Sequence, residues 1–374
     1  GVTQMTLSGS GGNDPISLLA QLTAKDVCLT IGEESYAQQV ALRLALPIRG
    51  NYIDSLRVDG TELMLNEFAI QLDGTVGTPS WALDTVNCDL HLRTNDWQIS
   101  RLMALLPPSV RDLWPKEVQA DGKLRLDAHV YGQYDSLSMP LADARLRLMD
   151  AAGQYTELPY YIDEMNADVE LHADWNTKNL TTARLRRLYA RTGETSVSAE
   201  GTVTNLLKNT NGLEIDDPLA TLVADIQIDL AEADYWIKEE GVTNRVRGKA
   251  IGHLQAKTRL SQVTNQQWSH IGAAADLRLK GLDVVWQDSI LAQAEEMKIA
   301  LQTQPKGKKN TLFATADIDF RQLHADLLSS QLNAHIPNGT LTGEIELNYK
   351  DTSVLPIMMF KISTSVGCMP TRPT

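Results

Sequence analysis

The sequence predicts a mostly β protein, built as an elongated, repetitive, twisted and curved antiparallel sheet with a groove-like face and a few short helices. Three observations predict this fold class. Apolar and polar residues alternate over many short segments, turn-forming residues separate these segments, and similar segments recur at long intervals along the chain. Alternation at period two gives a strand one apolar face and one face in water, which is typical of antiparallel sheets.

The alternation defines the expected strands. Residues 123–130, KLRLDAHV, alternate without a break, and Asp121-Gly122 supplies a turn signal just before them. Gly, Asn, Asp and Pro residues punctuate the other segments in the same way. The strands predicted on this ground are 86–93, 123–130, 143–148, 163–174, 225–230, 275–280, 314–320 and 343–350.

Two helices are expected in the N-terminal third. The segment 95–108, NDWQISRLMALLPP, has an Asn-Asp cap, an apolar stripe at helical spacing and a Pro-Pro stop. The segment 14–22, DPISLLAQL, places proline at the first helical position and Ile16, Leu19 and Leu22 on one stripe.

The chain also repeats. Gly122 and Gly248 each open an alternating segment and lie 126 residues apart, while DGTV at 73–76 and EGTV at 200–203 lie 127 apart. Two independent markers that agree within one residue predict a duplication, and stacked units are typical of repeat proteins. We expect an N-terminal strand-helix portion, two β-repeat units and a shorter third unit with the tail, at 1–60, 61–200, 201–310 and 311–374.

The composition is that of a folded, acidic protein. Hydrophobic residues make up 43% and charged residues 22% of the 374, which argues against disorder. The formal net charge of −13 argues against nucleic-acid partners and against a polybasic grip on anionic membranes. The three cysteines have no CxxC spacing and indicate neither a disulfide framework nor a zinc site.

The acidic segment 163–174 can be interpreted as a row of catalytic carboxylates or as the solvent-exposed face of a strand. Residues 163–174, DEMNADVELHAD, place Asp168, Glu170, His172 and Asp174 on one strand face, about 6.6 Å from one to the next. That spacing matches the two carboxylates of inverting glycosidases. The pattern recurs on other strands, however, and a wet face beside Lys and Arg does not raise a carboxyl pKa as a general acid requires. We predict a solvated face, with a glycan hydrolase as the enzymatic alternative.

No catalytic, cofactor-binding or metal-binding residues are predicted, and no cofactor. His91, His129, His172 and His253 occupy polar-face positions without HxH or HExxH spacing. No GxGxxG, GxxxxGK[ST] or GxSxG motif occurs. The arginine-rich segment 183–193 suits a phosphate head group in its chemistry, but charge balance against acidic neighbours is the simpler interpretation.

The most informative feature is therefore the quantity of one-sided strand. Aromatic residues are only 6%, so the predicted apolar faces are smooth and aliphatic. Such faces bury one another in a closed sandwich, whereas in an open curved sheet they line a trough that suits acyl chains, since each CH₂ withdrawn from water contributes about 0.8 kcal/mol. We predict an open lipid groove lined by Leu90, Leu92, Leu124, Leu126, Leu146, Leu148, Val169, Leu171, Ile226 and Ile228.

Part of the sequence resembles AsmA-like proteins, particularly those of Bacteroidetes. The resemblance rests on FAIQLDGTVG, on DLHLRTNDWQISRLMALLPPSVRD, and on the DGKLRLDAHVYG strand with the following LADARLRLMDA and ELP turn region, and it spans residues 60–350 or thereabouts. It implies a periplasmic protein anchored in the inner membrane by an N-terminal helix that precedes this sequence. It also implies kinship with TamB and the bridge-like lipid-transfer proteins, whose curved sheets enclose a hydrophobic groove. The family has no catalytic residues to carry over.

Taken together, the residues and the resemblance predict a non-enzymatic protein of outer-membrane biogenesis in the periplasm. Its expected partners are phospholipid or another acyl-chain lipid, the inner membrane through the N-terminal anchor, and envelope proteins, with no nucleic acid. The alternative is a periplasmic β scaffold that binds other envelope proteins by strand addition.

Overall fold

The computed structural model describes residues 3–11, 16–31, 34–51, 55–78, 84–105, 118–136, 138–155, 161–174, 181–205, 217–235, 243–265, 267, 270–304, 311–327, 332–348 and 357–365. Most of these residues lie in antiparallel strands that form an open sheet, and the helical segments are short, which confirms the predicted fold class. The chain divides into two units that are described separately. Unit 1 comprises residues 1–188 and 204–216, and unit 2 comprises residues 189–203 and 217–374.

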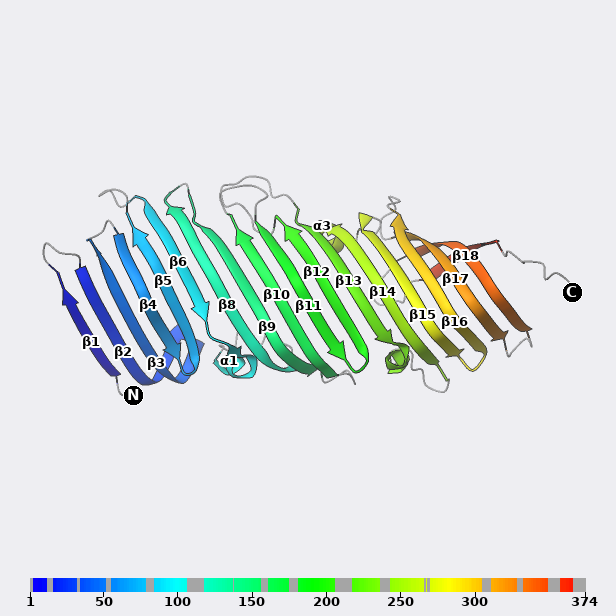
Figure 1. The fold of residues 1–374 in the computed structure, drawn as a ribbon, viewed down its shortest axis with the longest axis horizontal. Coiled ribbons are helices and arrows are strands. Elements are labelled where there is room, and N and C mark those ends of the chain that lie inside the picture. Colours follow the sequence, from blue (N-terminus) through cyan, green and yellow to red (C-terminus); the bar gives the residue numbers. More distant parts are fainter. Residues whose placement is uncertain are drawn as a thin grey trace, which may run out of the picture. The chain divides into compact units, whose positions relative to one another are not determined.

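Unit 1 is an antiparallel meander in which each strand pairs with the strand before it in the chain (Figure 1). The two-residue strand β7 pairs with β8, so β8 contacts both β6 and β7. The elements are β1 (Thr3–Ser10), β2 (Ile16–Ile31), β3 (Glu34–Asn51), β4 (Ser55–Leu65), β5 (Phe68–Gly77), β6 (Val86–Thr94), β7 (Trp97–Gln98), α1 (Ile99–Leu105), β8 (Val118–Tyr134), β9 (Leu141–Tyr155) and β10 (Tyr161–Ala173). Strand β11 (Thr182–Thr192) begins in this unit and crosses into the next.

Unit 2 continues the same plan. Strands β13 to β19 pair in chain order, again antiparallel. The elements are β12 (Thr195–Thr204), β13 (Leu219–Asp229), the 3-10 helix η1 (Leu230–Tyr235), β14 (Arg245–Arg259), α3 (Leu260–Thr264), β15 (Gly272–Trp286), β16 (Ile290–Gln304), β17 (Thr311–Leu327), β18 (Leu332–Asn348) and β19 (Ile357–Ser365). The predicted strands therefore lie within observed ones, except that Asp174 follows the end of β10, that Leu230 begins η1 and that 349–350 lie outside the described residues.

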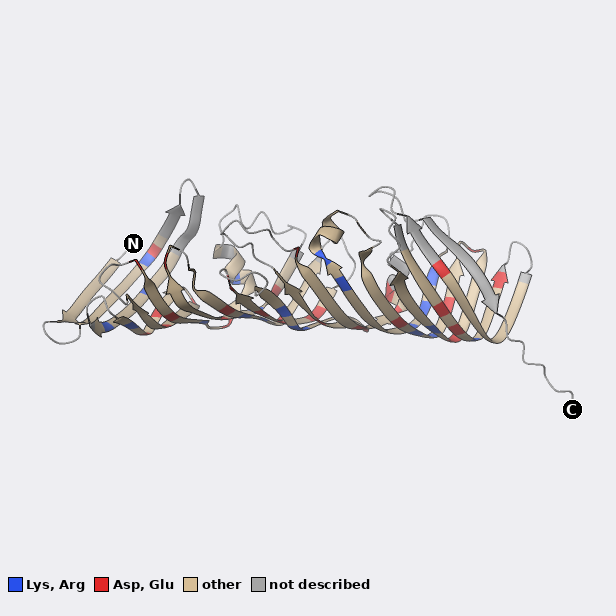
Figure 2. Ribbon diagram, turned by 90° about the horizontal axis from the view of Figure 1, so that it is seen from above, with Lys and Arg blue, Asp and Glu red and all other residues tan. Residues whose placement is uncertain are grey.

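The two glycines that mark the sequence repeat are β-bulges. Gly122 in β8 has φ of 147° and Gly248 in β14 has φ of 123°, and the strand register shifts across each of them. A bulge adds an unpaired residue to one strand and bends it. Figure 2 shows the strands bending along their length. The repeated markers thus have the same backbone role, which supports the repeat character of the sheet.

The predicted helix at 14–22 is wrong. Residues 14 and 15 lie outside the described part of the chain, and Ile16–Leu22 belong to β2, paired with β1 on one side and β3 on the other. The segment carries two apolar spacings at once, because Ile16, Leu18, Ala20 and Leu22 also alternate at period two. Pairing with two neighbouring strands selects the second spacing, since tertiary context overrides a weak helical preference.

The second predicted helix is present as α1, which begins at Ile99, later than the Asn-Asp cap implies. Asn95 instead caps the end of the β5–β6 pair. Its side-chain Oδ1 accepts a hydrogen bond from the Ala69 backbone N–H at 2.9 Å, and its backbone N–H donates to the Ala69 carbonyl at 3.2 Å. The following Trp97 packs edge-on against Phe68, which is 3% exposed, at a ring distance of 5.7 Å. The predicted Pro-Pro stop lies outside the described residues.

Few large side chains are fully buried in the described residues. Val40 is the one large side chain with under 2% exposure, and eight of the ten buried apolar residues are alanines. A closed sandwich of this length would bury many Leu, Ile and Val side chains between its layers. The buried apolar side chains of the described strands are thus mostly small, unlike those of a closed sandwich.

Candidate functional site

The strand register brings the predicted groove residues of unit 1 onto one face. Residues directly opposite each other on antiparallel strands share a face. Leu126 of β8 lies opposite Leu146 of β9, which lies opposite Val169 of β10, and Leu124 lies opposite Leu148. A second row runs Leu92, Ala128, Ala144 and Leu171 across β6, β8, β9 and β10, and Leu90 lies opposite Val130. We call this surface the aliphatic face.

The two predicted residues of unit 2 also share a face. Ile226 of β13 lies opposite Gly252 of β14, and Ile228 lies opposite Ala250. A Cβ placed on Gly252 would meet Leu277 Cδ2 and come within 3.0 Å of Ile226 Cγ1, so both aliphatic side chains fold over the glycine. The aliphatic face of unit 2 is thus also continuous from strand to strand, with a smaller residue at its centre.

None of the ten predicted residues is buried. Leu146 is 40% exposed, and the other nine are half-buried. Partial exposure of aliphatic side chains on a strand face leaves apolar area that a ligand with hydrocarbon chains can cover. In the described part of the chain this face has the properties of a surface rather than of a packed interior.

The opposite, polar face carries the acidic row of β10, and its members are held by ion pairs. Arg145 of β9 donates two hydrogen bonds to Asp168, at 2.8 and 2.5 Å. Arg186 of β11 donates to Glu170 at 2.7 Å, and His172 contacts Asp143 at 2.7 Å. Asp168, Glu170 and His172 therefore each have a partner on an adjacent strand. Asp174 differs from the prediction of a solvated face, because it lies just beyond β10, is only 8% exposed, and hydrogen bonds through its backbone N–H and carbonyl to the Thr181 hydroxyl.

The charges on this face lower carboxyl pKa values. The hydrogen bond from Arg145 holds the pKa of Asp168 below its ordinary value, and burial opposes this shift without reversing it. In unit 2 the hydrogen bond from Arg278 likewise lowers the pKa of Glu296. A general acid at neutral pH needs the reverse shift, so the environment of Asp168 argues against the glycosidase alternative.

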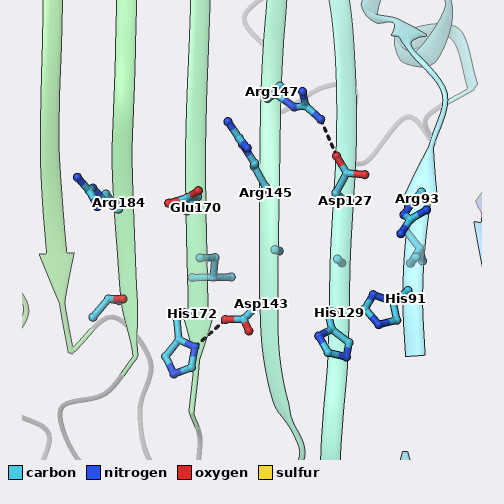
Figure 3. A pocket seen from close by; sticks show the side chains of 15 residues that line it. His91, Arg93, Asp127, His129, Asp143, Arg145, Arg147, Glu170, His172 and Arg184 are labelled. Atoms are coloured by element: carbon cyan, nitrogen blue, oxygen red, sulfur yellow. Dashed lines mark hydrogen bonds and ion pairs between the residues drawn. The ribbon is translucent and has the colours of Figure 1, made fainter. Parts of the chain in front are cut away.

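An open hollow of about 640 Å³ lies on the polar face of unit 1, and its lining is mostly polar, with Leu92, Ala128, Ala144 and Leu171 also contributing. Figure 3 shows the labelled His91, His129 and His172 along one side of it, with Arg93, Arg145, Arg147 and Arg184 along the other. The His91 and His129 rings stack at 3.8 Å, and Asp89 reaches both. The alternation of residues predicts that these histidines lie on the polar face but does not predict which of them meet.

The signal for that cluster was present in the sequence but incomplete. Asp89 and His91 are two residues apart on one strand face, as are Asp127 and His129. Which of these groups meet depends on the register between β6 and β8, which places His91 opposite His129. Spacing within one strand does not fix that register.

The arginine-rich segment does not form a single anion site. Arg184 lines the hollow, and Arg186, two residues on along β11, pairs with Glu170. Arg187 follows Arg186 directly in the strand and therefore points to the other face. Charge balance accounts for Arg186, in line with the simpler interpretation.

Comparison of the chain with protein-family models, with curated proteins and with solved structures finds no match. Among the helices of the described residues, none has the length and apolar character needed to span a bilayer. The function is therefore inferred from the two faces of the sheet.

Proposed function

We propose that this chain is a non-enzymatic periplasmic protein of outer-membrane biogenesis, whose aliphatic face binds phospholipid acyl chains and conducts them between the inner and outer membranes. In this proposal an N-terminal helix outside the sequence anchors the protein in the inner membrane. The proposal rests on one observation: eight predicted residues of unit 1 form cross-strand rows on one face and remain partly exposed.

The energetics favour a hydrocarbon ligand on such a face. Burial of one CH₂ contributes about 0.8 kcal/mol, so an acyl chain of ordinary length gains on the order of 10 kcal/mol from full coverage. The rows of unit 1 consist of Leu, Val and Ala, which offer no polar contact that favours one position over the next. A uniform lining lets an acyl chain move from strand to strand along these rows without large barriers, whereas a pocket with a few polar anchors fixes one ligand in one pose.

Co-purified lipid is the direct test. The intact protein, extracted under gentle conditions and examined by native mass spectrometry and by lipid extraction, is expected to carry phospholipid. Leu126→Asp and Leu171→Asp place a charge in the centre of the aliphatic face and are expected to remove most of that lipid, because a buried unpaired carboxylate against acyl chains is strongly unfavourable. Circular dichroism of each variant checks that it folds.

A matched control uses the same substitution on the other face. Ile251 is an aliphatic side chain, 50% exposed, that lies opposite Gln227 and Arg278 on the polar side of β14. Ile251→Asp is expected to retain the lipid. The proposal fails if the wild-type protein is lipid-free, or if Ile251→Asp loses as much lipid as folded Leu126→Asp.

A scaffold function has its own supporting observation. All eight residues of β1 are exposed, including Met5 at 68% and Leu7 at 63%. Exposed strands of this kind pair with strands of other proteins. Partners captured from envelope extracts by the wild-type protein and lost on Leu7→Pro, with no lipid bound in either, would favour the scaffold over lipid transfer.

A further inference from the structure

A histidine pair on the polar face of unit 1 has the arrangement of metal ligands. His91 of β6 and His129 of β8 are directly opposite in the strand register. Their rings stack at a centroid distance of 3.8 Å with 11° between their planes. Asp89, two residues before His91 on β6, lies on the same face.

The three side chains bring their ligand atoms close together. Asp89 Oδ1 is 2.7 Å from His129 Nε2 and 3.5 Å from His91 Nε2. The ligand atoms of all three residues lie within 4.8 Å of one another. The side chains are accessible, at 61% exposure for Asp89, 44% for His91 and 32% for His129. An ion can therefore reach the cluster from solvent without opening the sheet.

We propose that Asp89, His91 and His129 bind a divalent transition-metal ion, with Zn²⁺ as the best fit. Imidazole nitrogen and carboxylate oxygen bind Zn²⁺ at about 2.0–2.2 Å, which sets neighbouring tetrahedral ligands at roughly 3.3 Å from one another. The 3.5 Å distance from Asp89 Oδ1 to His91 Nε2 is close to this value, and the 2.7 Å contact from Asp89 Oδ1 to His129 Nε2 opens by about half an ångström. Because an imidazole lone pair lies in the ring plane, the stacked rings must turn about their side-chain bonds until both Nε2 atoms face the ion, and water completes the coordination.

Other His-Asp contacts in the described residues do not converge in this way. His172 and His253 each meet one aspartate, Asp143 and Asp225, at 2.7 and 2.8 Å. His324 and His335 are also directly opposite on β17 and β18, but their rings are 6.1 Å apart and tilted by 54°. That second pair is a natural control for the first, since it shares the residue types and the cross-strand position.

The surroundings suit a cation. Asp143 lies opposite His129 on β9 and adds a second carboxylate near the cluster. Tyr131 stacks on His129 at 4.6 Å and limits the motion of that ring. Arg93 follows His91 by two residues on the same strand face, and Asp127 lies opposite it in the register. This site lies on the polar face and is independent of lipid binding on the aliphatic face.

The test uses the full chain without a polyhistidine tag. Isothermal titration with ZnCl₂ is expected to show one saturable site per chain, and Co²⁺ is expected to give the visible absorption of a low-symmetry site. His91→Ala, His129→Ala and Asp89→Asn are each expected to weaken binding at least tenfold, as loss of a ligand costs at least as much as loss of an outer partner.

His324→Ala serves as the matched control and is expected to leave the affinity unchanged. Circular dichroism of all variants confirms that they fold. The proposal is overturned if the wild-type protein shows no saturable Zn²⁺ binding. It is also overturned if folded His91→Ala and His129→Ala bind as the wild type does, or if His324→Ala loses as much affinity as they do.

Discussion

Strands β8 and β14 share one backbone feature, a glycine bulge, but differ in the side chains of their aliphatic faces. Each follows a short helical segment, α1 or η1, and each has a bulged glycine followed by lysine, in Gly122-Lys123 and Gly248-Lys249. Beyond the bulge the aliphatic face of β8 carries Leu124, Leu126, Ala128 and Val130, whereas that of β14 carries Ala250, Gly252, Leu254 and Ala256. The repeat preserves backbone geometry and the alternation of faces, while the volume of the side chains is free to differ.

This difference separates what the repeat needs for folding from what it needs for binding. A bulge requires a residue that tolerates positive φ, which few residues besides glycine do at low cost. The aliphatic face requires only apolar character, which Leu and Ala both supply. We therefore expect the two bulges to be equally sensitive to substitution. We expect the two aliphatic faces to tolerate the exchange of one apolar residue for another.

The largest effect is expected from the bulge glycines. Gly122→Ala places a Cβ 2.7 Å from Ala151 Cα, and Gly248→Ala places one 2.8 Å from the carbonyl oxygens of Lys280 and Gly281. Positive φ alone costs an alanine about 1–3 kcal/mol, and the backbone contacts add to this. We expect both variants to lower the free energy of unfolding by at least this amount, measured by urea denaturation.

Gly272→Ala is the control for these two variants. Its Cβ would stand 3.6 Å from the Lys257 carbonyl oxygen, an ordinary contact, and its φ lies outside the left-handed range. We expect no loss of stability. A loss at Gly122 without one at Gly248 would contradict the equivalence of the two strands.

The strands and the repeated glycines show which features of the fold the sequence predicts well. Alternation located the strands and their faces, because period two is a local property that each strand carries in its own residues. The 126-residue spacing of Gly122 and Gly248 predicted a repeat, but the turn expected at Asp121-Gly122 is wrong, because these residues form a bulge inside β8. The helix predicted at 14–22 was wrong because Leu18 and Leu19 let the segment satisfy both periods.

The candidate sites were predicted unequally for a related reason. The aliphatic face follows from strand phase alone, since a register shift by two residues leaves every leucine on the same side. The cluster of Asp89, His91 and His129 depends on which residue of β6 meets which residue of β8. That register is set by pairing across the sheet, with an intervening helix and 106–117 between the strands, so no local pattern reveals it.

A smaller effect is expected from the ion pairs of the polar face. Asp168 has a folded-state pKa below its ordinary value of 3.8 because of Arg145, so its contribution to stability is present above that pH and is lost as the pH falls through the lowered folded-state pKa. The pair is partly exposed, with side-chain exposures of 39% and 22%, so Asp168→Asn is expected to cost about 1 kcal/mol or less at pH 7.

Urea denaturation of wild type and Asp168→Asn at neutral pH and near pH 3 measures this dependence. The difference between the two proteins is expected to shrink at the lower pH. The difference in unfolding free energy between wild type and Glu296→Gln in unit 2 is also expected to shrink on acidification. This loss begins at a higher pH than for Asp168, because the ordinary pKa of a glutamate is 4.5. A difference that grows on acidification would show that the carboxylates are not stabilised by their arginines.

The smallest effect is expected at the centre of the aliphatic face in unit 2, and it bears most directly on whether that face is open. In Gly252→Ala the three atoms nearest to the new methyl group belong to the side chains of Leu277 and Ile226 and not to the backbone. On an open face these side chains rotate outward, and alanine also loses less chain entropy than glycine on folding, so the free energy of unfolding is expected to stay within about 0.5 kcal/mol of wild type. In a tightly packed interior the same methyl group costs about 1–3 kcal/mol. A cost in that range would mean that the aliphatic side chains are locked against one another, which leaves no trough for an acyl chain.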